Sequence, residues 1–167
     1  DLYTRSLFAS QLSHRGINLR GGEEDAVLHA VRIRRFVTRE CVTAAPDTPV
    51  DAVRSDLAHS PVPIVFVLDP ERHLVGVVTM RDLAEIEDRT SGGRQIRCRD
   101  VMEKPPPVLT LGDDLAQGLD LFEISRLGSL PVVDDRTGGH FVGAVRGEEL
   151  MHAYHDNLRQ VREEEHS

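Results

Sequence analysis

The chain contains the same pattern of residues twice, at an offset of 65 to 67 positions. The matched stretches are 31–38 with 96–103, 50–57 with 115–127, 64–69 with 130–135, and 73–79 with 140–146. Because the order of these stretches is the same both times, the chain is a duplication. Any fold for it has to be built from two similar units.

Each unit is predicted to contain a short strand, a helix, a two-stranded hairpin and a second helix. Short β-branched runs bounded by turn residues indicate the strands. The first helices begin after Asp47-Thr48 and Asp113-Asp114, which predict capped starts, and they keep apolar residues on one face. The second helices are expected from about Arg81 and Gly147. This mixture of elements indicates the α+β class, and units of about 60 residues are expected to share a core.

The predicted organisation has four parts and a linker. They are a helical connector (1–30), two repeats (31–90 and 96–156), an acidic tail (157–167) and a linker between the repeats (88–95). In the connector, apolar residues recur at helical spacing from Leu2 to Leu12 and stop at Gly16, which predicts an amphipathic helix. A second short helix is expected around 24–31.

Composition excludes several classes of function. The chain carries 28 acidic and 20 basic residues, a net charge of −8, which argues against nucleic acid as a partner. Apolar runs such as 74–80 are too short to cross about 30 Å of hydrocarbon, and no signal-peptide pattern opens the chain. The chain starts at Asp1 rather than Met, so we expect a segment of a longer or processed protein. Cys41 and Cys98 are too few for a disulfide framework or a zinc site and are expected to be small core residues.

Three motifs give the repeat a family resemblance. They are Asp100-Val101-Met102, Leu130-Pro-Val-Val-Asp134 and Gly76-Val-Val-Thr-Met-Arg-Asp-Leu83. In this order and in duplicate they resemble the tandem CBS domain pair, or Bateman module. The resemblance implies two β-α-β-β-α repeats packed as a pseudo-twofold pair, preceded by the helical segment, and a homodimer.

The amino-terminal segment narrows the resemblance. The stretch from Leu2 to Ile33 is similar to the connector between the membrane part of bacterial ClC chloride channels or transporters and their CBS pair. Lys104 is the only lysine, a bias typical of GC-rich bacterial genomes. The resemblance implies a regulatory module on the cytoplasmic side of the membrane, attached to a membrane-embedded transport domain of the same parent chain.

Thr79 and Asp82, at the junction of a strand and a helix, have two interpretations. Thr-x-x-Asp is close to a capping box, which stabilises a helix by roughly 1 kcal/mol. The same geometry exposes helix amides to a phosphate and places a carboxylate where ribose hydroxyls can bind. In CBS pairs the equivalent residues contact ribose and phosphate, so the resemblance implies an adenine nucleotide (ATP, ADP or AMP) as a regulatory ligand.

The resemblance also implies which residues complete this site. The other repeat would supply Met102 and Pro107 from one stretch and Gly128, Ser129 and Leu130 from another, which would line the base. Arg81 and Arg126 are candidate phosphate contacts.

The second repeat departs from the motif, with Arg146 in place of the hydroxyl residue and Glu149 in place of the aspartate. A second, weaker site would combine these with Thr38, Val62 and Pro63. The alternative is an empty, degenerate groove.

His152 and His155 have a spacing that can bind a transition metal, with Glu148 and Glu149 one turn earlier. A solvated helix face is the preferred interpretation, and no metal is expected. No Walker, Rossmann, nucleophile-elbow or zincin motif occurs, so no catalysis is expected. Two alternatives to the chloride-transport assignment stay open. One is a ligand-free dimerisation module, and the other is the regulatory CBS pair of another enzyme or transporter.

Overall fold

The computed structural model describes residues 22–87 and 93–166. The first half contains β1 (Val42–Ala44), α3 (Val50–Ala58), β2 (Ile64–Leu68), β3 (Leu74–Thr79) and α4 (Met80–Glu87). The second half contains β4 (Leu109–Thr110), α6 (Leu115–Ser125), β5 (Ser129–Val133), β6 (Phe141–Arg146) and α7 (Gly147–Glu165). The order β-α-β-β-α therefore occurs twice, and the predicted α+β fold class is confirmed. The predicted helix between Leu2 and Gly16 lies outside the described residues.

Three short helices precede the two halves along the chain. They are α2 (Gly22–Ala30) and η1 (Ile33–Phe36), which lead into the first half, and α5 (Cys98–Val101), which leads into the second. None of the helices in the described ranges is long and apolar enough to cross a membrane.

Each half forms a three-stranded sheet of the same topology, β1-β2-β3 and β4-β5-β6. The first two strands of each sheet are parallel and the hairpin strands are antiparallel. The register pairs Ile64 with Thr79 and Ser129 with Arg146. Ile64 therefore corresponds to Ser129, whereas the matched sequence runs paired it with Leu130. The difference arises because the turn between β5 and β6 is longer than the turn between β2 and β3.

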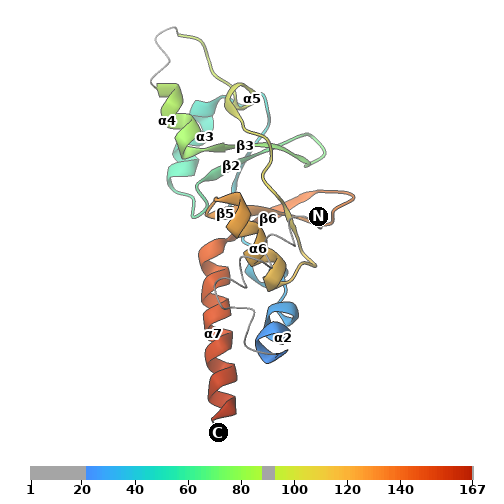
Figure 1. Cartoon of the computed structure of the whole chain (residues 1–167). Helices are drawn as coiled ribbons and strands as arrows, with labels where there is room; N and C mark the ends of the chain where they lie inside the picture. The colour runs from blue at the N-terminus through green and yellow to red at the C-terminus, as the bar shows by residue number, and fades with distance from the viewer. Residues whose placement is uncertain (1–21, 88–92, 167) are drawn as a thin grey trace.

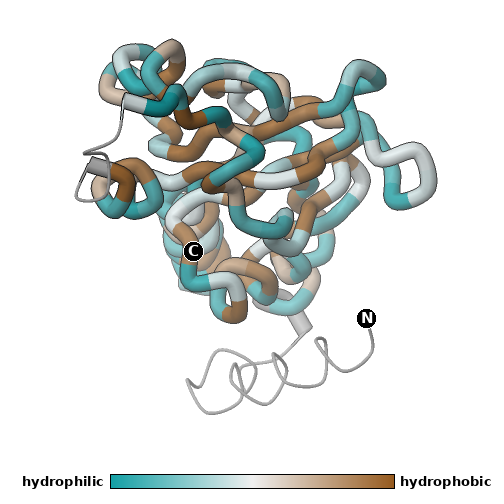
Figure 2. The backbone as a smooth tube through the Cα atoms, turned by 90° about the horizontal axis from the view of Figure 1, so that it is seen from above, coloured by the Kyte–Doolittle hydropathy of each residue, from teal (hydrophilic) through white to brown (hydrophobic). Residues whose placement is uncertain are grey.

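The two sheets are stacked, with α3 and α4 at one end and α2, α6 and α7 at the other (Figure 1). Hydrophobic stretches run through the centre of the backbone trace and hydrophilic ones through the outer loops (Figure 2). A cluster that includes Val62, Phe66, Val77, Phe141 and Ala144 joins the sheets, and the rings of Phe66 and Phe141 are 4.9 Å apart. The halves thus share a core, as units of this size require.

The two segments that lead into the halves, 33–38 and 98–103, each pack against the opposite half, and we call them the exchanged segments. Glu103 exchanges two backbone hydrogen bonds with Val77 of β3 (3.0 and 2.8 Å), and Thr38 does the same with Ala144 of β6 (2.8 and 3.0 Å). Ile33, which lies before β1 at the start of the first repeat, is buried in the core of the second half. Cys98, which lies before β4 at the start of the second repeat, is buried in the core of the first half. This exchange ties the two repeats into one folded body.

Glycines allow the exchanged segments to approach so closely. A Cβ on Gly76 would lie 2.7 Å from the sulfur of Met102, and one on Gly143 would lie 2.3 Å from the carbonyl oxygen of Thr38. The glycine at the same place in both repeats therefore marks the crossing of the chain over the sheet.

The first helices of the two halves begin differently. As predicted, Asp114 caps α6 in a capping box with Gln117. Helix α3 has no side-chain cap, and the hydroxyl of Thr48 accepts the Ala45 amide instead. The carbonyl of Ile96 accepts the first helical amide, Val50 N, at 2.9 Å, so the start of the second repeat supplies the cap.

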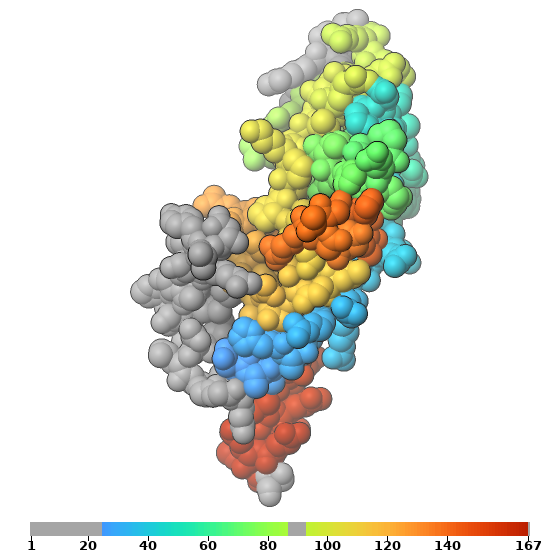
Figure 3. Space-filling view, turned by 90° about the vertical axis from the view of Figure 1, so that its right-hand side faces the viewer, coloured from blue at the N-terminus to red at the C-terminus, as the bar shows by residue number. Residues whose placement is uncertain are grey.

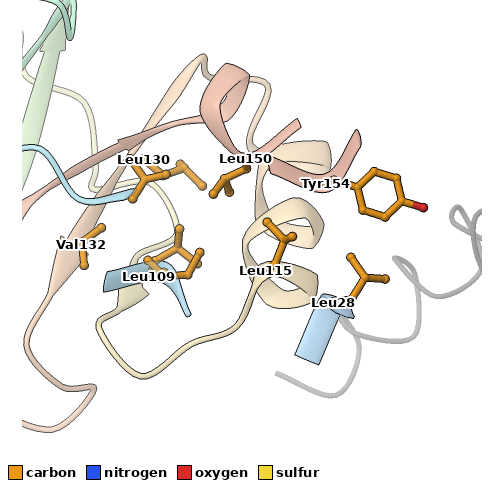
Figure 4. Close-up of a cluster of buried hydrophobic side chains, with 9 residues drawn as sticks. Leu28, Leu109, Leu115, Leu130, Val132, Leu150 and Tyr154 are labelled. Carbon is orange, nitrogen blue, oxygen red and sulfur yellow. The ribbon is translucent and has the colours of Figure 1, made fainter. Parts of the chain in front are cut away.

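Helix α7 is longer than its counterpart α4 and extends away from both sheets (Figure 1). The segment expected as an acidic tail is helical as far as Glu165. Leu28 of α2 and Tyr154 of α7 lie at the outer end of the second core (Figure 4). The extra turns of α7 thus have apolar support near their start.

Candidate functional site

Thr79 and Asp82 form the predicted capping box at the start of α4. The Thr79 amide and hydroxyl both donate to Asp82 Oδ2, at 2.8 and 2.9 Å. The Asp82 amide lies 3.3 Å from Thr79 Oγ1. No hydrogen bond from the described residues reaches the other carboxylate oxygen, Oδ1. One oxygen therefore holds the helix start while the second keeps its capacity to accept.

A hollow of about 420 Å³ lies beside Asp82. It is bounded by α4 and by the segment that leads into α5, and its lining is Asp82, Glu85, Ile86, Arg94, Ile96, Asp100 and Val101. Arg94 brings a guanidinium to the same hollow as the Asp82 carboxylate. The sequence analysis did not single out Arg94, although the arginine-rich run 94–99 was a visible signal.

The neighbouring arginines of this run have partners. Arg97 donates to the backbone carbonyl of Asp47 at 3.0 Å, and Arg99 forms an ion pair with the Asp47 carboxylate. These two side chains anchor the linker to the loop before α3, whereas Arg94 lines the hollow next to Asp82.

The structure brings Met102 to the strand that carries Thr79. Met102 is half-buried, packs against the first core and lies over Gly76 of β3. Met102 is not among the residues that line the hollow beside Asp82. Pro107 is exposed in the stretch between Glu103 and β4, and no contact of the described residues links it to Asp82.

The second predicted stretch, Gly128 to Leu130, belongs to the β5 side of the other sheet. Ser129 is buried and paired with Arg146, and the Gly128 carbonyl accepts the Gly147 amide at 2.9 Å. Leu130 points into the second core, beside Leu150 (Figure 4). Strand alternation turns its side chain away from the other sheet, and a role of Leu130 in a nucleotide site stays a prediction.

The two arginines considered for phosphate contacts are exposed. Arg81 is on α4, with its side chain 87% exposed and 3.5 Å from Glu85. Arg126 is the left-handed residue at the end of α6, with φ 59°. Neither reaches the hollow beside Asp82, whose cationic lining residue is Arg94.

In the second repeat, Arg146 is paired with the carboxylates around it. Its guanidinium lies 3.3 Å from Glu148 and 3.8 Å from Glu149. The Thr38 hydroxyl accepts the Glu40 amide at 3.2 Å. These contacts use the groups that a ligand would need, which fits the empty-groove alternative.

Of the apolar residues assigned to this second site, Val62 is fully buried between the sheets and Pro63 is exposed. Val62 therefore belongs to the shared core, and its side chain cannot line an open groove.

The remaining reactive groups have ordinary structural roles. His152 lies 3.9 Å from Glu148 on the exposed face of α7, and the ring of His155 packs against Tyr154. Burial raises the pKa of the Cys41 thiol to about 11 and also raises the pKa of Cys98. Both thiols thus stay protonated at neutral pH, as small core residues do.

Comparison with known proteins identifies the repeats. The family model of the CBS domain matches the chain twice, over residues 33–88 and 98–156. The chain belongs to the CBS-domain family. It is a tandem CBS pair, and the matches cover both β-α-β-β-α units, including the exchanged segments from Ile33 and Cys98.

Relatives carry this CBS pair in different contexts. Inosine-5'-monophosphate dehydrogenase of Thermoplasma acidophilum is 28% identical over 129 residues, which are 77% of this chain and 25% of the enzyme. The chain thus spans about a quarter of this curated relative.

Two solved structures share the fold and contain nucleotides. The cytosolic domain of the Mg²⁺ channel MgtE in complex with ATP matches with a TM-score of 0.61 and 20% identity, over 77% of this chain and 52% of that one. CBSX2 in complex with AMP matches with a TM-score of 0.63 and 24% identity, over 80% and 99%.

Proposed function

We propose that this CBS pair is a non-catalytic regulatory module that binds an adenine nucleotide at the site of Thr79 and Asp82. The observation that carries the proposal is the divided role of the Asp82 carboxylate. Oδ2 caps α4, and the same side chain lines a hollow that also contains Arg94. In one hollow, a carboxylate can accept hydrogen bonds from ribose hydroxyls and a guanidinium can donate to a phosphate.

The chemistry of the site follows from these groups. Asp82 Oδ1 accepts hydrogen bonds from ribose hydroxyls, the start of α4 presents amides to a phosphate, and Arg94 neutralises phosphate charge. Met102 supplies an apolar surface for the base. The ATP and AMP bound by the two solved CBS proteins support an adenine nucleotide as the ligand.

The site of the second repeat is proposed to stay empty. Arg146 occupies the position of the hydroxyl residue and pairs with Glu149, the residue that would hold the ribose. A ligand would have to break this pair before binding. One nucleotide per chain is therefore expected.

The nucleotide would act on a larger protein by favouring one arrangement of the pair over another. From the resemblance of the connector, we further propose that the larger protein is a bacterial chloride channel or transporter with this module on the cytoplasmic side of the membrane. From the resemblance to CBS pairs, we propose that it forms a homodimer. The relatives support the broader assignment to a transporter or an enzyme, since they include a magnesium channel and a dehydrogenase. The gene sequence before the Asp1 codon distinguishes these: a region of hydrophobic helices supports a transporter, and a catalytic barrel supports an enzyme.

The test is a thermal-shift panel of ATP, ADP, AMP, NAD and S-adenosylmethionine, followed by calorimetry on two variants. Asp82→Asn keeps an oxygen for the cap but removes the charge, so we expect affinity to fall roughly 10- to 100-fold, because hydrogen bonds to charged groups contribute about 1.5–3 kcal/mol. Glu149→Gln is the matched control and should bind normally.

Two results would contradict the proposal. Unchanged affinity in Asp82→Asn would remove the site assignment. A nucleotide present at a hundred times its dissociation constant should raise the free energy of unfolding by about 2.7 kcal/mol. If no nucleotide of the panel raises the melting temperature, the pair is a structural dimerisation module.

A further inference from the structure

The turns of the two hairpins meet at a pair of histidines. His73, just before β3, and His140, just before β6, form an isolated antiparallel bridge. Their rings are stacked, with centroids 4.9 Å apart and planes at 27°. The Phe141 amide donates to the Arg72 carbonyl at 2.9 Å, which fixes the two turns against each other. Figure 3 shows the hairpins, green and orange, side by side on one face of the molecule.

The ring of His73 has a hydrogen-bond acceptor on each side. His73 Nδ1 lies 3.2 Å from Asp69 Oδ2, within its own turn. The ring also forms a hydrogen bond with the backbone of Gly138, in the turn of the other repeat, and this bond favours the protonated ring. A bond that favours protonation needs an acceptor opposite the ring, so its partner is the Gly138 carbonyl. One side chain thus connects the two turns.

Only the protonated ring can serve both acceptors. A neutral imidazole has one N–H group and one lone pair, whereas an imidazolium has two N–H donors. In the neutral ring, a lone pair would face either the Asp69 carboxylate or the Gly138 carbonyl. One contact is therefore lost when His73 gives up its proton. Because the charged carboxylate is the stronger acceptor, the contact with Gly138 is the one given up.

Both acceptors are held in place by their own turns. Asp69 Oδ1 accepts the His73 amide at 2.8 Å. This bond holds the pKa of Asp69 below its usual range, so the carboxylate is ionised at neutral pH. In the second turn, the Asp135 carboxylate accepts the Gly138 amide. The acceptors therefore stay where they are when the ring between them titrates.

The charged groups around the ring favour a cation. In the first turn, Glu71 Oε2 lies 3.6 Å from His73 Nδ1. In the second turn, the stacked ring of His140 is paired with Asp134 Oδ2 at 3.1 Å. Arg136 of that turn donates to a carboxylate before α6, at 3.0 and 3.1 Å, so its charge is balanced there. The protonated ring of His73 thus faces more negative than positive charge.

We propose that His73 is a proton-sensitive tie between the two repeats, closed while both ring nitrogens carry a proton and released from Gly138 when the ring is neutral. The hydrogen bond to Asp69, with smaller contributions from Gly138 and Glu71, raises the pKa of His73 above its ordinary value of 6.5. The tie is therefore complete below the ordinary pKa and is lost as the pH rises through the raised pKa of the folded state.

The first measurement is an NMR titration of the histidine ring signals. We expect the midpoint of His73 to lie above its ordinary pKa. In Asp69→Asn the midpoint should fall, because the amide keeps an oxygen for the His73 backbone amide but has no charge to stabilise the imidazolium.

The second measurement is hydrogen exchange of the Phe141 amide, which bonds across the junction. Its protection factor should be roughly two- to fivefold higher at pH 6 than at pH 8, as the loss of one partly exposed hydrogen bond implies. His73→Gln removes the titrating ring and should abolish this difference. His140→Gln is the matched control at the same junction and should keep it. Circular dichroism checks that each variant is folded.

Three results would overturn the proposal. The first is a midpoint of His73 at or below its ordinary pKa. The second is a pH-dependent protection of Phe141 that persists in His73→Gln. The third is a difference that disappears in His140→Gln, which would assign the response to the second ring or to the stack.

Discussion

Asp82 caps a helix and is also the residue proposed to hold the ribose of a nucleotide. The Thr-x-x-Asp pattern alone allowed either a helix cap or a nucleotide contact, and the structure has the cap with one carboxylate oxygen to spare. Arg94, which lines the same hollow, was not predicted because its place beside α4 is a tertiary feature that no local pattern contains. The direction of the Leu130 side chain, into the second core, could not be predicted, because a motif does not show which face of a strand points inward.

Gly143 allows a direct prediction about the crossing of the exchanged segment. An added Cβ would meet the Thr38 carbonyl at 2.3 Å, and this neighbour is backbone that cannot turn aside. Gly143→Ala is expected to lower the free energy of unfolding by about 1–3 kcal/mol. Gly112→Ala is the control, since nothing lies within 4 Å of its Cβ position. Urea denaturation measures both, and equal stabilities would contradict the steric explanation.

At the scale of elements, periodicity and turn residues predicted most of the fold. The runs 50–57 and 115–127 became α3 and α6, and the hairpins formed where β-branched residues alternate with turns. The short helices η1 and α5 could not be predicted, because their apolar residues are buried in the opposite repeat. The cap of α3 could not be predicted either, because the carbonyl that supplies it belongs to Ile96, which is distant from α3 in the sequence.

The docking of α2 is expected to depend on pH. His29 Nδ1 lies 2.9 Å from Asp114 Oδ2, and this hydrogen bond, with a further contribution from Asp25, raises the pKa of His29. The protonated form is favoured in the folded state, so the contact stabilises the docked helix fully below the unfolded pKa of about 6.5. The contribution is lost as the pH rises through the folded pKa.

Hydrogen-exchange protection factors for α2 should therefore be higher at pH 6 than at pH 8. His29→Gln should remove this difference, whereas His59→Gln, at the exposed end of α3, should leave it. A difference that persists in His29→Gln would assign the pH dependence to another group.

At the scale of the whole molecule, the two repeats are expected to unfold as one cooperative unit. Their sheets share a buried cluster, and the exchanged segment of each repeat pairs with a strand of the other repeat. The duplication predicted a pair with a common core, but the exchange of segments is a tertiary feature that no local pattern contains. The meeting of His73 with His140 is of the same kind, since matched positions come together only once the repeats are paired.

Phe66→Ala tests this cooperativity. Phe66 is fully buried against Phe141 of the other half, and its truncation should cost about 3–5 kcal/mol. Both sheets should lose exchange protection at the same urea concentration. Met151→Ala, at an exposed position, should change stability by less than about 0.5 kcal/mol. Loss confined to the first sheet would show that the halves unfold separately.

The exchanged segments also protect the edges of the two sheets against aggregation. An open strand edge is a template on which another chain can add and aggregate. In the described part of the chain, β3 and β6 are crossed at their edges by Glu103 and Thr38, and the opposite edges are β1 and β4, with three and two residues. Sheet-to-sheet polymerisation therefore finds little backbone to extend.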